Sequence, residues 1–334
     1  MDYQRITGKK VLVTGGAGFI GSNLCEDLLE YNNEVVCLDN FATGYKQNIE
    51  TFLNNPQFKF IEGDIRDLAT CENACQGIDI VLHQAALGSV PRSINDPITT
   101  NEVNISGFLN MLVAARDANI KRFVYAASSS TYGDSEILPK VEEIIGLPLS
   151  PYAVTKYVNE LYAYIFFKTY GLETIGLRYF NVFGRRQDTN STYAAVIPKF
   201  VSQLMHYESP VINGDGSNSR DFTYIDNVIH MNHLAASTDN KAAIGEVFNT
   251  AAGERSTLLQ LVELLKTNLA KHDFKIANLS IQFAPNRPGD ISHSLASINK
   301  AKDLLGYEPL FSFSEGVNNT VIWYVLNKKN YSKK

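Results

Sequence analysis

Two residues four positions apart, Tyr152 and Lys156, have the types and spacing needed to move a proton at a hydroxyl-bearing carbon. A tyrosine needs assistance to act as a base near neutral pH, because its unperturbed pKa is about 10. A lysine ammonium one helical turn away lies on the same helix face and favours the phenolate, which lowers the pKa of the tyrosine. We therefore predict that Tyr152 is an acid/base group and that Lys156 tunes it.

The position of Tyr152 distinguishes it from two other tyrosines, Tyr164 and Tyr324, that are also followed by a lysine four residues later. Tyr164 lies further along the same apolar helical pattern, and Tyr324 lies far from any cofactor motif, so packing explains both. Tyr152 stands near the start of a predicted helix, soon after a serine run that ends a strand-like segment at 123–127. Open α/β sheets bind ligands at that edge.

A glycine triplet, Gly15, Gly18 and Gly21, follows a strand-like run and opens a helical pattern. Glycines permit a tight turn and a close approach of the backbone to a pyrophosphate, and a helix N-terminus supplies unpaired N–H groups. The triplet therefore predicts a dinucleotide site that includes Gly15, Gly18, Phe19 and Ile20. Its spacing is Gly-x-x-Gly-x-x-Gly, whereas typical dehydrogenases have Gly-x-Gly-x-x-Gly.

The identity of the dinucleotide is indicated by Asp39, which ends the second predicted strand 24 residues after Gly15. A carboxylate at this place accepts hydrogen bonds from the adenosine ribose hydroxyls and repels a 2′-phosphate. No arginine lies between Arg5 and Arg66 to hold such a phosphate. The predicted cofactor is therefore NAD and not NADP.

Asp64 ends the third predicted strand and is a candidate for the adenine edge of the cofactor, although an ordinary surface turn also explains an aspartate there. Three neighbours of these strand ends complete the expected cofactor contacts: Asn40, Ile65 and Gln84.

Short β-branched runs alternate with helical patterns through the first half of the chain. The predicted strands lie at 11–13, 35–38, 58–61, 80–83, 123–126 and 174–177, and the predicted helices at 18–31, 67–76, 99–118 and 151–170. This alternation predicts βαβ units and a Rossmann-like, doubly wound parallel sheet of the α/β class.

After about residue 178 the pattern becomes irregular, with glycine-containing loops between short helices. We expect residues 1–178 to form an NAD-binding domain that includes the helix of Tyr152 and Lys156. Residues 179–334 are expected to form a smaller α/β substrate-binding part that possibly returns segments to the sheet. The substrate would then lie between the two parts.

The composition describes an ordinary globular chain, with 45% hydrophobic residues and a formal net charge of −5. This charge argues against nucleic acid or an anionic membrane as a partner. No run of about 18 apolar residues and no apolar leader occurs, so we expect a cytoplasmic protein. The four cysteines lack metal-site spacing and are expected to be reduced, and no metal is expected.

Together these motifs resemble the extended short-chain dehydrogenase/reductase family, and the likeness covers about residues 8–326. Within the family, the runs at 177–184 and 287–290 resemble nucleotide-sugar 4-epimerases. The run at 83–93 narrows the likeness to bacterial UDP-N-acetylglucosamine 4-epimerases of surface-polysaccharide pathways.

The resemblance implies a role for each catalytic residue. Tyr152 would be the acid or base at the sugar 4-hydroxyl, and Lys156 would also grip the nicotinamide ribose. Ser128 matches the hydroxyl that bridges the sugar oxygen and the tyrosine, with Ser129 as the close alternative.

The resemblance also implies the substrate contacts. Asn181 and Arg220 would hold a nucleotide diphosphate, joined by Arg287 and Asp290 at the phosphate and the uridine ribose, and Ala195 would lie beside them. Two arginines suit a diphosphate in an acidic protein, because guanidinium groups bind phosphate in a bidentate manner.

The sugar would be distinguished by the fourth residue after Asp290, which is Ser294. In the family, a tyrosine at this position leaves room only for a hydroxyl at the sugar 2-position, whereas a serine leaves room for an acetamido group. Gly88 and Ser89 offer a small, polar wall on the sugar-binding loop. The resemblance therefore implies interconversion of UDP-N-acetylglucosamine and UDP-N-acetylgalactosamine through a 4-keto sugar.

Three alternatives remain open. Relatives that remove water from the sugar carry Thr-Asp-Glu where this chain has three serines, which argues against elimination. A UDP-glucose/galactose epimerase would share every motif, and Arg92, Arg185 and Arg186 keep a UDP-glucuronic acid epimerase open. A non-catalytic NAD-binding regulatory protein is a remote alternative, since fold does not fix function.

The predicted helices at 99–118 and 151–170 resemble the pair that each subunit contributes to a four-helix dimer interface in this family. We therefore expect a homodimer. Packing within one chain is the alternative explanation of their apolar faces.

Overall fold

The computed structural model describes residues 4–188, 195–285 and 293–328. Its centre is a seven-stranded sheet of order β11-β6-β5-β4-β1-β2-β3 in which every neighbouring pair is parallel. The strands are β1 (Lys10–Thr14), β2 (Glu34–Asp39), β3 (Phe58–Glu62), β4 (Ile80–His83), β5 (Arg122–Ser128), β6 (Glu173–Tyr179) and β11 (Val247–Thr250). The predicted β-branched runs are the first six strands, and β11 comes from the C-terminal half.

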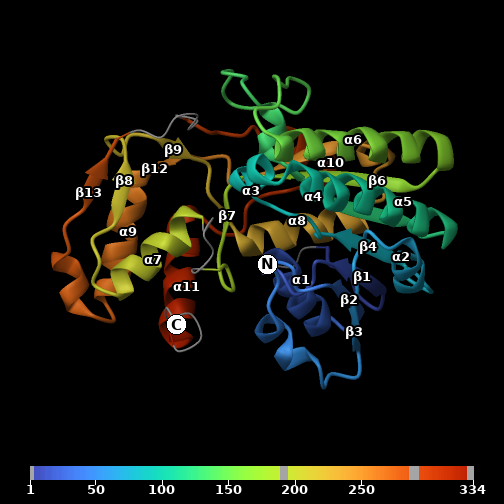
Figure 1. Cartoon of the computed structure of the whole chain (residues 1–334), viewed down its shortest axis with the longest axis horizontal. Coiled ribbons are helices and arrows are strands. Elements are labelled where there is room, and N and C mark those ends of the chain that lie inside the picture. Colours follow the sequence, from blue (N-terminus) through green and yellow to red (C-terminus); the bar gives the residue numbers. More distant parts are fainter. Residues whose placement is uncertain (1–3, 189–194, 286–292, 329–334) are drawn as a thin grey trace.

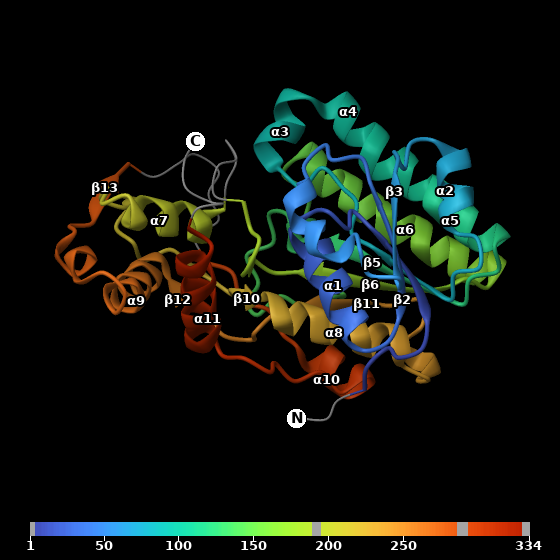
Figure 2. The same ribbon diagram turned by 90° about the horizontal axis from the view of Figure 1, so that it is seen from below.

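Helices cover both faces of this sheet. One face is covered by α2 (Leu68–Ala74), α5 (Phe108–Asp117) and α6 (Pro151–Tyr170), and the other by α1 (Phe19–Glu30) and α8 (Ile225–Ser237) (Figures 1 and 2). Each strand is therefore buried on two sides, which explains why β1 and β4 are almost continuously apolar. The prediction of a Rossmann-like, doubly wound parallel sheet is confirmed.

The sequence sets the ends of α6, the helix that carries Tyr152 and Lys156. The Ser150 side chain accepts a hydrogen bond from the N–H of Ala153 at 3.1 Å, and Pro151 occupies the first turn. Gly171, with φ of 74°, ends the helix in the left-handed conformation. Both ends use residues preferred at such positions, so the start of α6 is fixed beside the sheet edge.

The predicted continuous helix at 99–118 is wrong. In its place α3 (Val90–Asn95) and α4 (Pro97–Asn101) lead into a π-helical turn, η3 (Glu102–Gly107), before α5 begins. The wide turn brings the buried Asn104 against the loop after β4, where Leu87 donates its N–H to the side chain at 2.8 Å. Gly107 lets the turn approach Ile65, because a Cβ there would lie 2.6 Å from that side chain.

Residues after β6 form most of a smaller part beside the sheet, on the left of Figures 1 and 2. It holds α7 (Val196–Met205), α9 (Leu258–Ala270) and α11 (Phe313–Leu326), which pack on one another through α9. Three two-stranded sheets accompany them: β10 (Thr223–Tyr224) with β7 (Val182–Phe183), β12 (Ser256–Thr257) with β9 (Ser219–Arg220), and β13 (Gln282–Ala284) with β8 (Val211–Asn213). The short helix α10 (Asn299–Leu305) returns to contact β11.

Candidate active site

A cavity of about 330 Å³ lies at the carboxyl ends of the central strands. All the residues predicted to bind NAD, apart from Tyr152 and Lys156, line it: Gly15, Gly18, Phe19, Ile20, Asp39, Asn40, Asp64, Ile65 and Gln84. Gly88 and Ser89, which were assigned to the sugar, and Arg92 line the same cavity. The parallel sheet thus brings together residues from five separate loops, as open α/β sheets do at this edge.

The glycine turn fits a dinucleotide for a steric reason. Gly15 has φ of +67°, and a Cβ on it would lie 2.8 Å from the backbone nitrogen of Ala85. A Cβ on Gly21 would lie 2.1 Å from the carbonyl oxygen of Gly15. Only glycine permits this tight turn against the neighbouring loop, and the turn leaves the N-terminus of α1 open toward the cavity.

Asp39 is buried at the end of β2, beside the glycine turn. Its carboxylate accepts the N–H of Ala17 at 3.0 Å and the N–H of Phe41 at 2.7 Å. Burial raises the pKa of Asp39, and these backbone hydrogen bonds oppose the rise. The contacts fix the carboxylate at the cavity wall, where it can accept from ribose hydroxyls.

If Asp39 selects the cofactor, enzyme stripped of its nucleotide should regain more activity with NAD than with NADP. A 2′-phosphate would be forced toward a fixed, poorly solvated carboxylate, and like charges repel at short range. The measurement is turnover after reconstitution with each nucleotide at equal concentration. Equal recovery with NADP would show that Asp39 does not discriminate between them.

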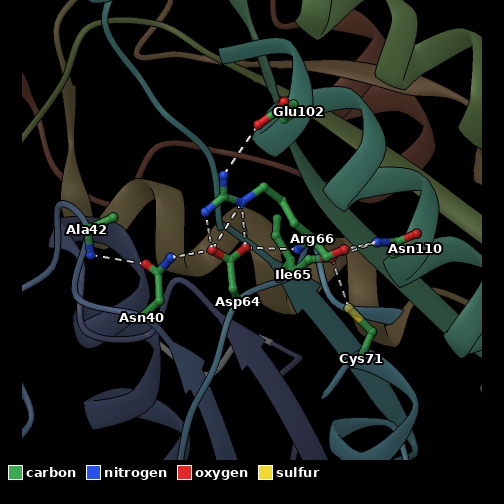
Figure 3. A network of polar contacts seen from close by, with 8 residues as sticks. All are labelled: Asn40, Ala42, Asp64, Ile65, Arg66, Cys71, Glu102 and Asn110. Atoms are coloured by element: carbon green, nitrogen blue, oxygen red, sulfur yellow. Dashed lines mark hydrogen bonds and ion pairs between the residues drawn. The ribbon is translucent and has the colours of Figure 1, made fainter. Parts of the chain in front are cut away.

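Asp64 is held in a polar network at the end of β3 (Figure 3). Arg66 donates to both carboxylate oxygens, with its shortest contact at 2.7 Å, and Asn40 donates its amide N–H at 3.0 Å. Arg66 also pairs with Glu102 at 3.4 Å, and these hydrogen bonds lower the pKa of Asp64. Most acceptor sites of the carboxylate are therefore in use, and its contact with adenine stays a prediction.

Tyr152 lies beside Ser128, which ends β5. The two side chains are hydrogen-bonded, and Ser128 also accepts from the hydroxyl of Ser130 at 2.9 Å. Burial raises the pKa of Tyr152 above its ordinary value, and the hydrogen bond with Ser128 lowers it. Of the two candidate serines, Ser128 is the one that reaches Tyr152, while Ser129 is half-buried in the first position of η4 (Ser129–Tyr132).

Lys156 is buried one turn after Tyr152, and its Nζ donates to the carbonyl oxygen of Ala126 at 2.7 Å. Burial lowers the pKa of Lys156 to about 8, and the carboxylate of Glu160 opposes this shift. An ammonium with a pKa this low can exchange its proton near neutrality, which suits a residue that shares protons with a tyrosine.

Behind Lys156 lies a buried ion pair that sequence patterns did not single out. Glu160 accepts from Arg178 on β6 through both carboxylate oxygens, at 2.9 and 2.8 Å. Arg178 also lies 4.8 Å from the ring centroid of Tyr132. The one available signal was a charged residue one turn after Lys156 on a helix that is otherwise apolar there.

A second pocket, of about 290 Å³, lies in the smaller part of the molecule. Asn181, Ala195 and Arg220, which were assigned to the nucleotide, all line it. Ser294 lies near this group, because its N–H donates to the carbonyl oxygen of Ser219 at 3.0 Å. Arg287 and Asp290 fall outside the described residues.

The arginines that left a carboxylate sugar open occupy different environments. Arg186 pairs with Glu26 on α1, and Arg185 pairs with Glu26 and with Asp226 on α8. These two guanidinium groups are therefore engaged between helices. Arg92 instead lines the cavity of the expected cofactor and sugar.

Two expected absences can be examined within the described ranges. Among those residues, no group of three or more histidine, cysteine, aspartate or glutamate side chains could hold a metal ion. None of the helices in the same ranges has the length and apolar character that crossing a membrane requires.

Known proteins resemble this chain over nearly its whole length. A UDP-N-acetylglucosamine 4-epimerase from Methanobrevibacter ruminantium M1, solved with UDP-N-acetylmuramic acid, is 40% identical with a TM-score of 0.88, covering 96% of this chain and 100% of that one. The UDP-glucose 4-epimerase of Thermotoga maritima, solved with UDP-glucose, is 34% identical with a TM-score of 0.87, covering 96% and 99%. The UDP-glucuronic acid 4-epimerase of Bacillus cereus, solved with its substrate and NAD, is 33% identical with a TM-score of 0.84, covering 95% and 99%.

These relatives and the geometry of the two pockets agree on the class of protein. The sequence pattern of the NAD dependent epimerase/dehydratase family matches residues 11–251. The predictions of an enzyme and of NAD as its cofactor are confirmed, which rules out the non-catalytic alternative. This chain belongs to the NAD-dependent epimerase/dehydratase family.

Proposed function

We propose that the chain interconverts UDP-N-acetylglucosamine and UDP-N-acetylgalactosamine by inverting carbon 4 of the sugar. The observation that carries this proposal is the hydrogen-bonded pair of Tyr152 and Ser128 at the carboxyl end of β5. The N–H of Tyr152 also donates to Ser93 on α3, at 3.1 Å, and the first turn of α3 lines the cofactor cavity. The acid/base group is thus anchored beside the cofactor.

In this proposal Tyr152 holds the proton of the sugar 4-hydroxyl during oxidation and returns it during reduction. Ser128 orients the sugar oxygen and the phenol, and the buried Lys156 supplies the adjacent positive charge. Bound NAD supplies a hydride acceptor that can also return the hydride. The three serines at 128–130 offer no carboxylic acid to expel a 6-hydroxyl, so the residues support epimerisation over elimination.

The acetylated sugar is favoured by the small residues around the expected sugar position. Gly88 and Ser89 leave space at the cavity wall, and Ser294 has a short side chain beside the strand of Arg220. The 40% identical relative, whose name specifies UDP-N-acetylglucosamine, supports the same preference. On this basis we also keep the proposed place in a bacterial surface-polysaccharide pathway.

UDP-glucose and UDP-glucuronic acid are the second candidates, because other relatives bear those names. The ion pairs of Arg185 and Arg186 weaken the case for a carboxylate sugar, while Arg92 in the cavity supports it.

The test is incubation of the enzyme with UDP-N-acetylglucosamine, UDP-glucose and UDP-glucuronic acid in separate reactions, without added reductant. NMR should show the C4 epimer forming fastest from the acetylated sugar. Faster turnover of either other sugar would reject the preference, and no turnover of any sugar would reject the reaction.

We also propose a homodimer formed through α5 and α6. The outer face of α6 exposes an apolar stripe of Val154, Leu161, Tyr164 and Ile165, each at least 45% exposed. Light scattering should give about twice the chain mass of 37.1 kDa at micromolar concentration, because such a stripe loses free energy in water. Leu161→Arg should shift the mass toward one chain, and a wild-type monomer would contradict the interface.

A further inference from the structure

Asp221 is a fully buried carboxylate that no step of the proposed chemistry uses, and it directly follows Arg220. Its exposed fraction is 0%. The carboxylate accepts three backbone N–H groups, from Ala252 at 2.9 Å, Gly253 at 3.2 Å and Ala296 at 3.2 Å. Burial raises the pKa of Asp221 to about 7, and the three N–H donors oppose this rise. Removing a carboxylate from water is costly, so three donors indicate a structural task.

The three donors belong to the two segments that flank Arg220. On one side, Ala252 and Gly253 precede β12, whose Ser256 pairs with Arg220 in the antiparallel ladder. On the other side, Ala296 follows Ser294, whose N–H donates to Ser219 at 3.0 Å. The side chain of Asp221 therefore fastens the strand of Arg220 to both of its neighbours.

The same residue also contacts the second predicted diphosphate ligand. The amide of Asn181 donates to the backbone carbonyl of Asp221 at 3.0 Å, and Asn181 has a φ of 33°, which is unusual for a residue other than glycine. Asn181 and Arg220 then meet in the 290 Å³ pocket. Four segments distant in sequence thus converge on one carboxylate.

We infer that Asp221 is a positioning residue for the nucleotide diphosphate of the substrate, acting through Arg220 and Asn181. This inference rests on the proposed function, because it requires a nucleotide in the pocket of Arg220. An asparagine at position 221 could not replace the carboxylate, since its amide NH₂ would face backbone donors. The expected consequence is a loose Arg220 and weaker binding of the diphosphate.

The experiment compares wild type, Asp221→Asn and the exposed control Asp303→Asn on α10. Calorimetry measures the affinity for UDP, and NADH fluorescence measures the affinity for the cofactor. We expect Asp221→Asn to raise the dissociation constant for UDP and the KM of the UDP-sugar by about tenfold or more. NADH affinity and kcat at saturating sugar should stay within about twofold, and Asp303→Asn should match wild type.

A double-mutant cycle with Arg220→Ala tests whether Asp221 acts through its neighbour. In the Arg220→Ala background, Asp221→Asn should add much less to the loss of UDP affinity than it does in wild type. Full additivity would overturn the inference, as would unchanged UDP affinity in the single variant.

Parallel loss of UDP affinity, NADH affinity and the urea unfolding midpoint would also overturn it, because a general structural role predicts all three. If Asp221→Asn does not fold, Asp221→Glu keeps the charge with a longer side chain, and the same split between UDP and NADH is expected. Wild-type enzyme that does not bind UDP would instead reject the proposed function.

Discussion

Replacing Tyr152 with phenylalanine is expected to lower turnover by about two to four orders of magnitude, the range for loss of a general acid or base. The change keeps the ring that packs at the start of α6 and removes only the hydroxyl that bonds to Ser128. NAD should still bind, because the other predicted cofactor residues lie on separate loops of the cavity. The measurement is kcat for the preferred UDP-sugar, with bound NAD assayed in parallel.

The same helix supplies the matched control. Tyr164 is also followed by a lysine four residues later, but its side chain is 48% exposed and Lys168 lies 5.4 Å from its ring centroid. Tyr164→Phe should leave turnover nearly unchanged. Near-normal turnover in Tyr152→Phe, or an equal loss in both variants, would remove Tyr152 from the reaction.

The tuning of Tyr152 by Lys156 stays a prediction. The sequence argument assumed that a lysine one turn away acts directly on the phenol. In the structure, the two groups that influence the pKa of Tyr152 are its buried surroundings and Ser128, and the Nζ of Lys156 donates to Ala126. The spacing therefore predicted which residues share a helix face, but not which hydrogen bonds they make.

Much of the Rossmann half could be predicted because its signals are local. The glycine turn needs residues within one strand–turn–helix unit, and Asp39 is recognised by its place at the end of the next strand. Buried parallel strands are apolar on both faces, so β1 and β4 stand out without tertiary information. The π-helical turn at 102–107 could not be predicted, because it depends on Asn104 meeting a loop distant in sequence.

The smaller part shows where local signals end. Arg220 could be assigned from its resemblance to a family motif, whereas the carboxylate of Asp221 could not. The three donors of Asp221 come from residues 252, 253 and 296, and no spacing rule connects these positions. The same holds for Glu160 and Arg178, which lie on a helix and a strand and pair only after the sheet forms. Buried charges are placed by tertiary contacts, so a single sequence shows only their types.

The choice of sugar should depend on Ser294. We expect Ser294→Tyr to lower turnover of UDP-N-acetylglucosamine by roughly an order of magnitude at least, because overfilling a packed site costs about 1–3 kcal/mol. The backbone of Ser294 is held to Ser219 by a 3.0 Å hydrogen bond, next to the strand of Arg220. A tyrosine ring at this position therefore could not withdraw by a backbone shift and would have to occupy nearby space.

UDP-glucose is the internal control for this substitution. Its 2-hydroxyl is smaller than an acetamido group, so turnover of UDP-glucose by Ser294→Tyr should stay close to that of wild type. The comparison uses kcat/KM for both sugars in both proteins, because that ratio reports differential stabilisation of the transition state. Equal losses on both sugars would mean that the ring disturbs the pocket in general. Unchanged values on both would mean that Ser294 lies outside the sugar site, and the acetamido preference would then have to come from Gly88 and Ser89.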